Sequence, residues 1–134
     1  MVIFIVSFIC LFIILYNTVD ATQAEISIEN EISYKLIKDI IKNNVSIGKI
    51  YEINVTLVNT GLEISNELTV NLTDEENFSL TKKIILNPGE SKVVSFTWST
   101  LLIKNQQITI NYYPSNPDID WNQFNSGSKA FTFI

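Results

Sequence analysis

The sequence predicts an all-β fold, an antiparallel two-sheet β-sandwich, preceded by an N-terminal hydrophobic α-helix of the transmembrane type. Two observations carry this. Residues 1–19 contain no charged side chain. From residue 45 onward, apolar and polar residues alternate with the period of half-buried strands. We therefore divide the chain into a hydrophobic helix (1–21), a linker (22–43) and a β-sandwich (44–134).

The apolar segment comes first. Residues 2–16 are polar only at Ser7 and Tyr16, and nineteen residues in a helix extend ~28 Å, close to the ~30 Å thickness of a bilayer core. Three interpretations stay open: a retained single-span anchor, the N-terminal packing helix of a pilin-like filament subunit, and a signal peptide cut after the small residues near Ala21. No lysine precedes the segment, as a signal peptide normally requires. Cys10 lies within it, and we expect an inert thiol.

The linker is expected to hold two short elements. Residues 25–29 alternate like a strand. Apolar residues then recur at intervals of three and four, which predicts an amphipathic helix ending near Asn43 and Asn44. It would cover one end of the following domain or lie on the membrane surface. The residues that define it are Ile32, Leu36, Ile37, Ile40 and Ile41.

Six alternating runs follow, and residues 25–29 add a seventh strand. The apolar residues that define the six are Ile53, Val55, Leu57; Leu68, Val70, Leu72; Phe78, Leu80; Val94, Phe96, Trp98; Ile108, Ile110, Tyr112; and Phe131, Phe133. Between two of the runs, Pro88 and Gly89 suit the central positions of a type II turn, because proline fixes φ and glycine accepts a positive φ. No helical pattern separates these runs, which excludes a parallel α/β sheet. Short strands separated by regular turns are typical of a sandwich.

Composition excludes several classes of function. The 134 residues carry a net charge of −5, with no histidine, no arginine and one cysteine. Without histidine there is no Ser-His-Asp or Cys-His unit, and one cysteine cannot form an internal disulfide. An acidic chain without arginine is poorly suited to nucleic acid. We therefore expect no enzyme, no cofactor and no nucleic-acid partner.

Two segments resemble a known family. Residues 51–61 read YEINVTLVNTG and residues 86–98 read LNPGESKVVSFTW. Together they look like CARDB, the cell-adhesion-related, immunoglobulin-like domain of bacterial and archaeal surface proteins. Residues 113–126 resemble its closing loop, although Asp120 and Gln123 stand where the family tends to have Glu. The resemblance covers about residues 44–134 and implies an immunoglobulin-like, non-catalytic extracellular module for adhesion or assembly.

Four Asn-x-Ser/Thr sequons are glycosylation candidates, at Asn44, Asn54, Asn71 and Asn77. A glycan needs an exposed asparagine. The last three lie on the polar parity of their runs, which permits a glycan at each. Polar residues occupy outward positions in any case, so the pattern also fits sequons that are not used.

The acidic clusters are weak metal candidates. Asp118 and Asp120 alternate with Asn122 like the start of a calcium loop, but Gln123 replaces the required glycine and Lys129 the final glutamate. We therefore expect no EF-hand; a looser calcium site on Asp118 and Asp120 stays open. Residues 74–76 (Asp-Glu-Glu) predict a solvated turn.

Trp121 and Phe124 are candidates for a binding tip, beside Tyr112 and Tyr113, because aromatic residues dominate binding hot spots. The alternative is that Phe124 and Tyr112 close the end of the core.

The leading functional hypothesis is a cell-surface adhesion or assembly module. Residues 1–19 would anchor it as a single-pass membrane protein with the β-domain extracellular, or it would be secreted if the segment is cleaved. Its partner would be an extracellular protein or glycan, met by edge strands and loop tips. The alternative is an archaeal type IV pilin-like or archaellum-accessory subunit, whose helix packs against copies of itself in a filament core.

Overall fold

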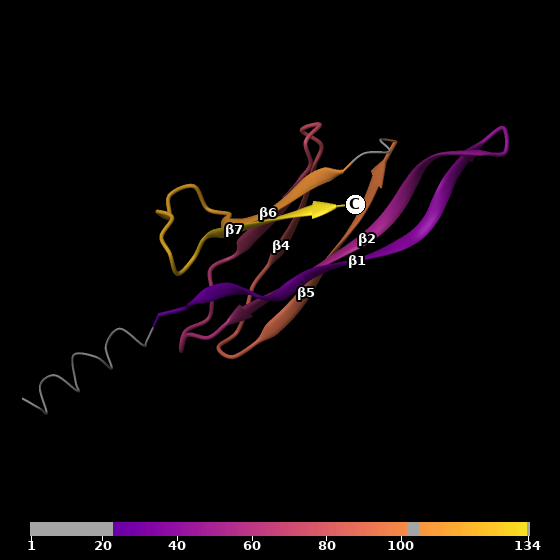
Figure 1. Cartoon of the computed structure of the whole chain (residues 1–134). Coiled ribbons are helices and arrows are strands. Elements are labelled where there is room, and N and C mark those ends of the chain that lie inside the picture. The colour runs from indigo at the N-terminus through magenta and orange to yellow at the C-terminus, as the bar shows by residue number, and fades with distance from the viewer. Residues whose placement is uncertain (1–22, 102–104, 134) are drawn as a thin grey trace, which may run out of the picture.

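The computed structural model describes residues 23–101 and 105–133 (Figure 1). Within these residues, every regular secondary-structure element is a β-strand. The helix predicted for residues 1–21, with Cys10, lies outside the described residues. The strands are β1 (Ile26–Lys42), β2 (Val45–Asn59), β3 (Leu68–Thr73), β4 (Ser79–Ile84), β5 (Ser91–Thr100), β6 (Gln106–Pro114) and β7 (Gly127–Phe133). All the predicted strands are present, so the all-β prediction is confirmed.

The strands form two antiparallel sheets. One has the order β1-β2-β5 and the other the order β4-β3-β6-β7. Strands that are distant in sequence are neighbours in both sheets: β2 pairs with β5, and β3 with β6. This arrangement is the two-sheet sandwich that the alternating runs predict.

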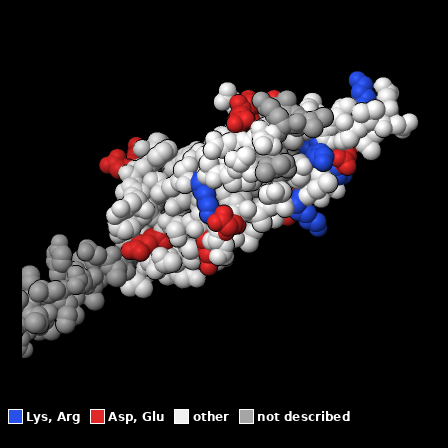
Figure 2. Space-filling model, viewed as in Figure 1, with Lys and Arg blue, Asp and Glu red and all other residues white. Residues whose placement is uncertain are grey.

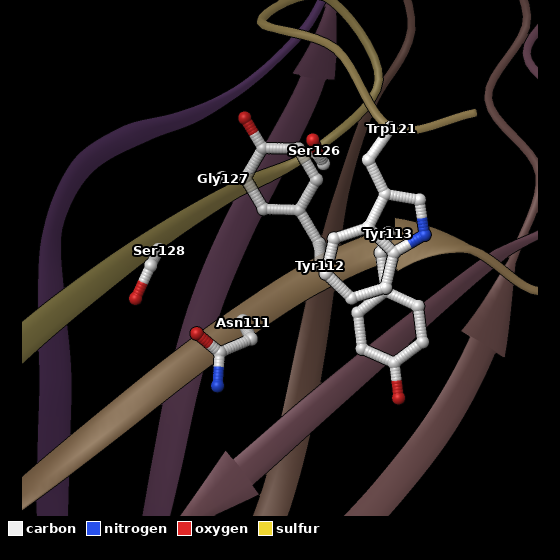
Figure 3. Close-up of a pocket in the computed structure, with 7 residues that line it drawn as sticks. All are labelled: Asn111, Tyr112, Tyr113, Trp121, Ser126, Gly127 and Ser128. Carbon is white, nitrogen blue, oxygen red and sulfur yellow. The ribbon is translucent and has the colours of Figure 1, made fainter.

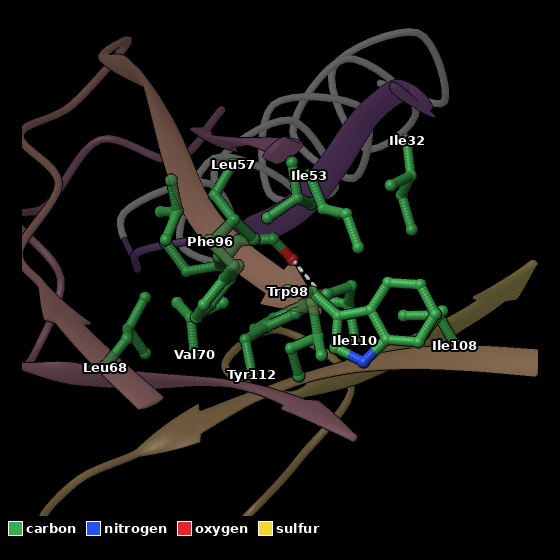
Figure 4. Close-up of a cluster of buried hydrophobic side chains, with 14 of the residues drawn as sticks. Ile32, Ile53, Leu57, Leu68, Val70, Phe96, Trp98, Ile108, Ile110 and Tyr112 are labelled. Atoms are coloured by element: carbon green, nitrogen blue, oxygen red, sulfur yellow. Dashed lines mark hydrogen bonds between the residues drawn. The ribbon is translucent and has the colours of Figure 1, made fainter. Parts of the chain in front are cut away.

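The core lies between the sheets and follows the predicted parity (Figure 4). Ile53 of β2 and Trp98 of β5 meet Val70 and Ile110 of the opposite sheet, and all four side chains are fully buried. Fully burying one such side chain stabilises the fold by ~1.5–3 kcal/mol. Phe78 is an exception to the parity: β4 begins one residue later, and the phenyl ring is 47% exposed.

The predicted amphipathic helix is wrong, because residues 26–42 are one long edge strand, β1. Its register against β2 shifts three times, between residues 29 and 33, 36 and 38, and 40 and 41. The first shift inserts two extra residues in β1, the second inserts one, and the third places its extra residue in β2. In the second half of β1, Leu36, Ile37 and Ile41 are all exposed, so no buried face imposes an alternation and the apolar spacing imitates a helical period. The segment treated as a linker is therefore part of the first sheet.

Asn43 and Asn44, expected at the end of that helix, form the turn of the β1–β2 hairpin. Both have positive φ, 52° and 63°. A two-residue hairpin turn of this hand needs positive φ at both positions, and asparagine tolerates it better than other residues with a Cβ.

Asn59, the last residue of β2, joins three parts of the chain. Its side chain is fully buried. Nδ2 donates to the carbonyl oxygens of Glu63 and Leu86 (2.8 and 3.1 Å), while Oδ1 accepts the backbone N–H groups of Glu25 and Gly61 (3.1 and 3.0 Å). One amide thus fixes the start of β1, the turn after β2 and the approach to the next turn.

The turn at residues 87–90 has the form predicted for Pro88 and Gly89. Gly89 has φ of 74°, and the N–H of Glu90 donates to the carbonyl of Asn87 (3.0 Å). Both features are those of a type II turn.

Residues 74–76 depart from the predicted solvated turn. Glu75 and Glu76 are exposed, but Asp74 is 9% exposed. Its Oδ1 accepts the backbone N–H groups of Glu76 and Phe78 (2.9 and 3.0 Å). The aspartate therefore closes the β3–β4 connection from within.

Candidate functional site

The loop between β6 and β7 carries the predicted binding tip, and asparagine side chains hold its shape. Asn122 Oδ1 accepts the N–H groups of Phe124 and Asn125 (2.8 and 3.1 Å), and Asn125 Oδ1 accepts that of Asn122 (2.8 Å). Asn125 Nδ2 donates to the carbonyl of Asp120 (3.0 Å). These bonds satisfy backbone groups locally, so the loop presents a fixed surface.

Trp121 stacks on Tyr113 at this loop. The ring centroids are 4.7 Å apart and the planes differ by 23°. Tyr113 lies on β6, paired with Thr69 of β3, and points away from the core because its neighbour Tyr112 points inward. The indole is 63% exposed. The pair forms a flat aromatic surface, the platform, supported by a paired strand.

A pocket of about 410 Å³ opens beside the platform (Figure 3). The hydroxyl of Ser126 is already engaged, donating to the carbonyl of Asn122 (2.7 Å). Asn111 and Ser128 lie directly opposite each other on β6 and β7. The pocket's lining residues are Asn111, Tyr112, Tyr113, Trp121, Ser126, Gly127 and Ser128.

Tyr112 belongs to the core. It is 6% exposed, and its hydroxyl donates to the carbonyl of Ile26 (2.9 Å). A Cβ on Gly127 would come within 2.5 Å of that hydroxyl oxygen, so the close approach needs glycine. Burial raises the pKa of the Tyr112 phenol above its ordinary value near 10.

Phe124 is half-buried and lines a different hollow, with Ile26 and Asn122 among its neighbours there. Its carbonyl accepts the N–H of Ile26 (2.7 Å). Tyr113, rather than Phe124, is therefore the ring that supports Trp121. The signal in the sequence was the outward parity of Tyr113 next to the inward parity of Tyr112. Ligand binding by Trp121 and Phe124 stays a prediction.

Asp118 and Asp120 stand in the same loop. The N–H of Asp118 donates to Asn116 Oδ1 (3.0 Å), and both aspartates lie at the surface. Within residues 23–101 and 105–133, no group of three or more His, Cys, Asp or Glu residues is arranged to hold a metal ion. We propose no calcium site there.

Two of the sequon asparagines lie in turns. Asn44 is in the β1–β2 turn and Asn77 is in the β3–β4 connection; both are exposed and have φ of 63°. Glycans could be attached there without disturbing the sheets.

The other two sequon asparagines lie on outer sheet faces and are half-buried. Asn54 Oδ1 accepts the hydroxyl of Ser95, and its Nδ2 donates to Glu52 Oε1 (3.1 Å). Asn71 Oδ1 accepts the hydroxyl of Ser79 (2.6 Å). A glycan on Asn54 would replace one of the two hydrogens of Nδ2, the atom that donates to Glu52. Asn44 and Asn77 are exposed, so the turn sites are the more accessible pair.

The distal half of the β1–β2 hairpin, residues 35–50, is here called the arm; most of it extends beyond the sandwich, while Lys49 and Ile50 still pair with Thr100 and Ser99 of β5 (Figure 1). Gly48 is the arm's one buried residue. Four lysines and one aspartate give the arm a net charge of +3, whereas the whole chain carries −5, so the remaining residues carry −8. Figure 2 shows lysine at the arm's tip. The arm's exposed large apolar side chains are Leu36, Ile37, Ile41, Val45 and Ile47.

The described part of the chain includes no helix long and apolar enough to cross a membrane. The apolar segment at residues 1–19 lies outside it.

Comparisons with known proteins give one family. The CARDB profile matches residues 34–117, which run from β1 to the loop after β6. No curated protein matches the chain. Among solved structures, a β-glucosidase from Erythrobacter marinus has a TM-score of 0.45 and 16% identity over 83% of this chain. This chain spans 16% of that one.

Proposed function

Since this chain belongs to the CARDB family of immunoglobulin-like domains, we propose that it is a non-catalytic adhesion or assembly module at the cell surface. In this proposal, residues 1–19 anchor it in the membrane as a single span and the sandwich is extracellular. The observation that supports the proposal is the match of the CARDB family to residues 34–117. Between residues 34 and 101, the regular secondary-structure elements are all strands of the two-sheet sandwich.

The path of the chain supports a tethered arrangement. The described chain begins at residue 23, and the N–H of Ile26 bonds to Phe124 in the β6–β7 loop. The arm extends from the opposite end of the sandwich (Figure 1). A tether formed by residues 1–19 would therefore hold the loop near the membrane and present the arm away from it.

Membrane extraction tests the tether. After expression of the full chain, we expect it to stay in the membrane pellet in alkaline carbonate, and the sandwich to be digested by protease added to intact cells. Ile5→Lys combined with Ile14→Lys should release the chain, because each charge in a span costs ~2.5–3.5 kcal/mol or more. Leu62→Lys with Val93→Lys, at positions 65% and 62% exposed, is the matched control and should stay in the pellet. A wild-type chain extracted by carbonate would refute the tether.

The arm favours a second candidate, a subunit that assembles with copies of itself. A two-stranded hairpin with exposed apolar side chains is marginally stable alone, so a covering partner would stabilise it. A second copy is the occupant that the charges favour, because an arm of +3 complements a remainder of −8. Contact between an arm and a different surface of the next copy is heterologous, and such contacts build open filaments unless the rotation closes a ring.

Sedimentation measurements test self-assembly. We expect full-chain oligomers in detergent that dissociate as salt rises, since surface charge attraction is screened. Ile41→Glu with Val45→Glu should abolish them, while Leu62→Glu, a matched exposed position, should not. Monomers at low salt, or oligomers that survive the arm substitutions, would rule out assembly through the arm.

A further inference from the structure

We propose that the Tyr113–Trp121 platform and its pocket bind a neutral sugar residue of a glycan. This inference rests on the proposed function as a surface module and names the class of ligand that one part of the module takes.

The stacked rings supply the apolar half of such a site. Tyr113 supports one face of the indole, and the indole stays 63% exposed. A pyranose ring presents a face of C–H groups, which pack against the electron-rich face of an aromatic ring. Because the stack and the loop bonds already order Trp121, little side-chain freedom is lost on binding.

The adjacent strands supply polar groups. The Asn111 amide and the Ser128 hydroxyl form no hydrogen bond to any residue in 23–101 or 105–133. An amide offers hydrogen-bond donors and an acceptor, and a hydroxyl group can donate and accept. Each hydroxyl group of a sugar also donates and accepts, so it needs partners of both kinds. Figure 3 shows both side chains along the strands that lead to the platform.

The lining also selects by charge. None of the described residues that line the pocket is Lys, Asp or Glu. Phosphorylated, sialylated or uronic ligands would have no cation to pair with, and a peptide ammonium no anion. A pocket of about 410 Å³ lies within the range of small-ligand sites. These features fit a neutral sugar.

Calorimetric titration of the full chain tests the proposal. The chain is held in a detergent without sugar headgroups, and the probes are hexasaccharides of glucose, mannose, xylose and N-acetylglucosamine. We expect at least one to bind saturably and to shift the emission of exposed Trp121, while buried Trp98 is unaffected. Trp121→Ala should weaken binding at least tenfold, Trp121→Phe should retain part of it, and Asn111→Ala should weaken it several-fold.

Leu62→Ala, at an exposed site outside the pocket, should leave affinity unchanged. The inference is overturned if no neutral hexasaccharide binds, if Trp121→Ala binds as well as wild type, or if acidic oligosaccharides or peptides bind more tightly than neutral sugars. Carbonate extraction and calorimetry are separate readouts. A chain that stays in the membrane pellet but binds no sugar would refute only the sugar-binding inference. A chain that carbonate extracts from the membrane would refute only the tether.

Discussion

The indole Nε1 of Trp98 donates a hydrogen bond to Oδ2 of Asp74 across 2.9 Å inside the sandwich. Trp98 lies on β5 of one sheet and Asp74 directly follows β3 of the other. The same carboxylate closes its own turn through Oδ1. The Asp74 carboxylate therefore accepts the hydrogen bond of Trp98, the largest fully buried side chain of the core, and connects the two sheets.

Asp74→Ala should destabilise the fold by about 3 kcal/mol, because it leaves the buried indole N–H and two backbone N–H groups without their acceptor. Asp74→Asn should recover part of this loss, since the amide oxygen can still accept the two backbone N–H groups while the NH₂ group would face the indole N–H. Equilibrium urea unfolding, followed by tryptophan fluorescence, measures both.

The control for Asp74 is Glu75→Ala, an exposed neighbour that should change stability by less than about 0.5 kcal/mol. Equal effects at the two positions would show that the turn's charge, and not the buried bonds, stabilises this region.

Asn59→Ala should cost roughly 3–4 kcal/mol, because the amide makes four hydrogen bonds in a fully buried position. Asn59→Asp should also destabilise the fold, since a carboxylate cannot donate to the carbonyls of Glu63 and Leu86. Amide hydrogen exchange provides the check: protection of the Glu25 and Gly61 N–H groups should fall first. Unchanged protection at both would contradict the assigned bonds.

Stability should fall at alkaline pH because of Tyr112. Burial holds the folded pKa of this phenol above its ordinary value near 10, so the folded chain keeps a proton that the unfolded chain releases. Its stabilising contribution is complete below about pH 10 and is lost as the pH rises through the folded pKa. Urea unfolding between about pH 8 and 11 measures this slope. Tyr112→Phe should lower stability at the lower end of that range and flatten the slope; a slope as steep as in wild type would assign it to other groups.

The sequence predicted the strands correctly because alternation reports directly on which face of a strand is buried. It failed at β1, where irregular pairing with β2 and exposed apolar side chains in the second half of the strand leave no regular alternation. A bulge is set by pairing with another strand, so residues 32–41 alone could not distinguish it from a helix.

The candidate site was predicted in part. Trp121 was identified from its residue type, but its partner ring depends on how the β6–β7 loop folds back over β6, which a local pattern does not encode. Asp74 shows the same limit. A carboxylate beside two exposed glutamates predicts a solvated turn, and only the opposite sheet brings the indole of Trp98 to it.

Retention of residues 1–19 as a membrane tether is the central claim, and mass spectrometry of the mature chain tests it most directly. The chain would be isolated from the membrane fraction and from the medium of the same cells, and its intact mass and N-terminal peptide determined. The tethered module predicts a membrane-fraction chain whose N-terminal peptide includes residues 2–19. A mature chain that begins near Thr22 and is recovered from the medium would contradict it.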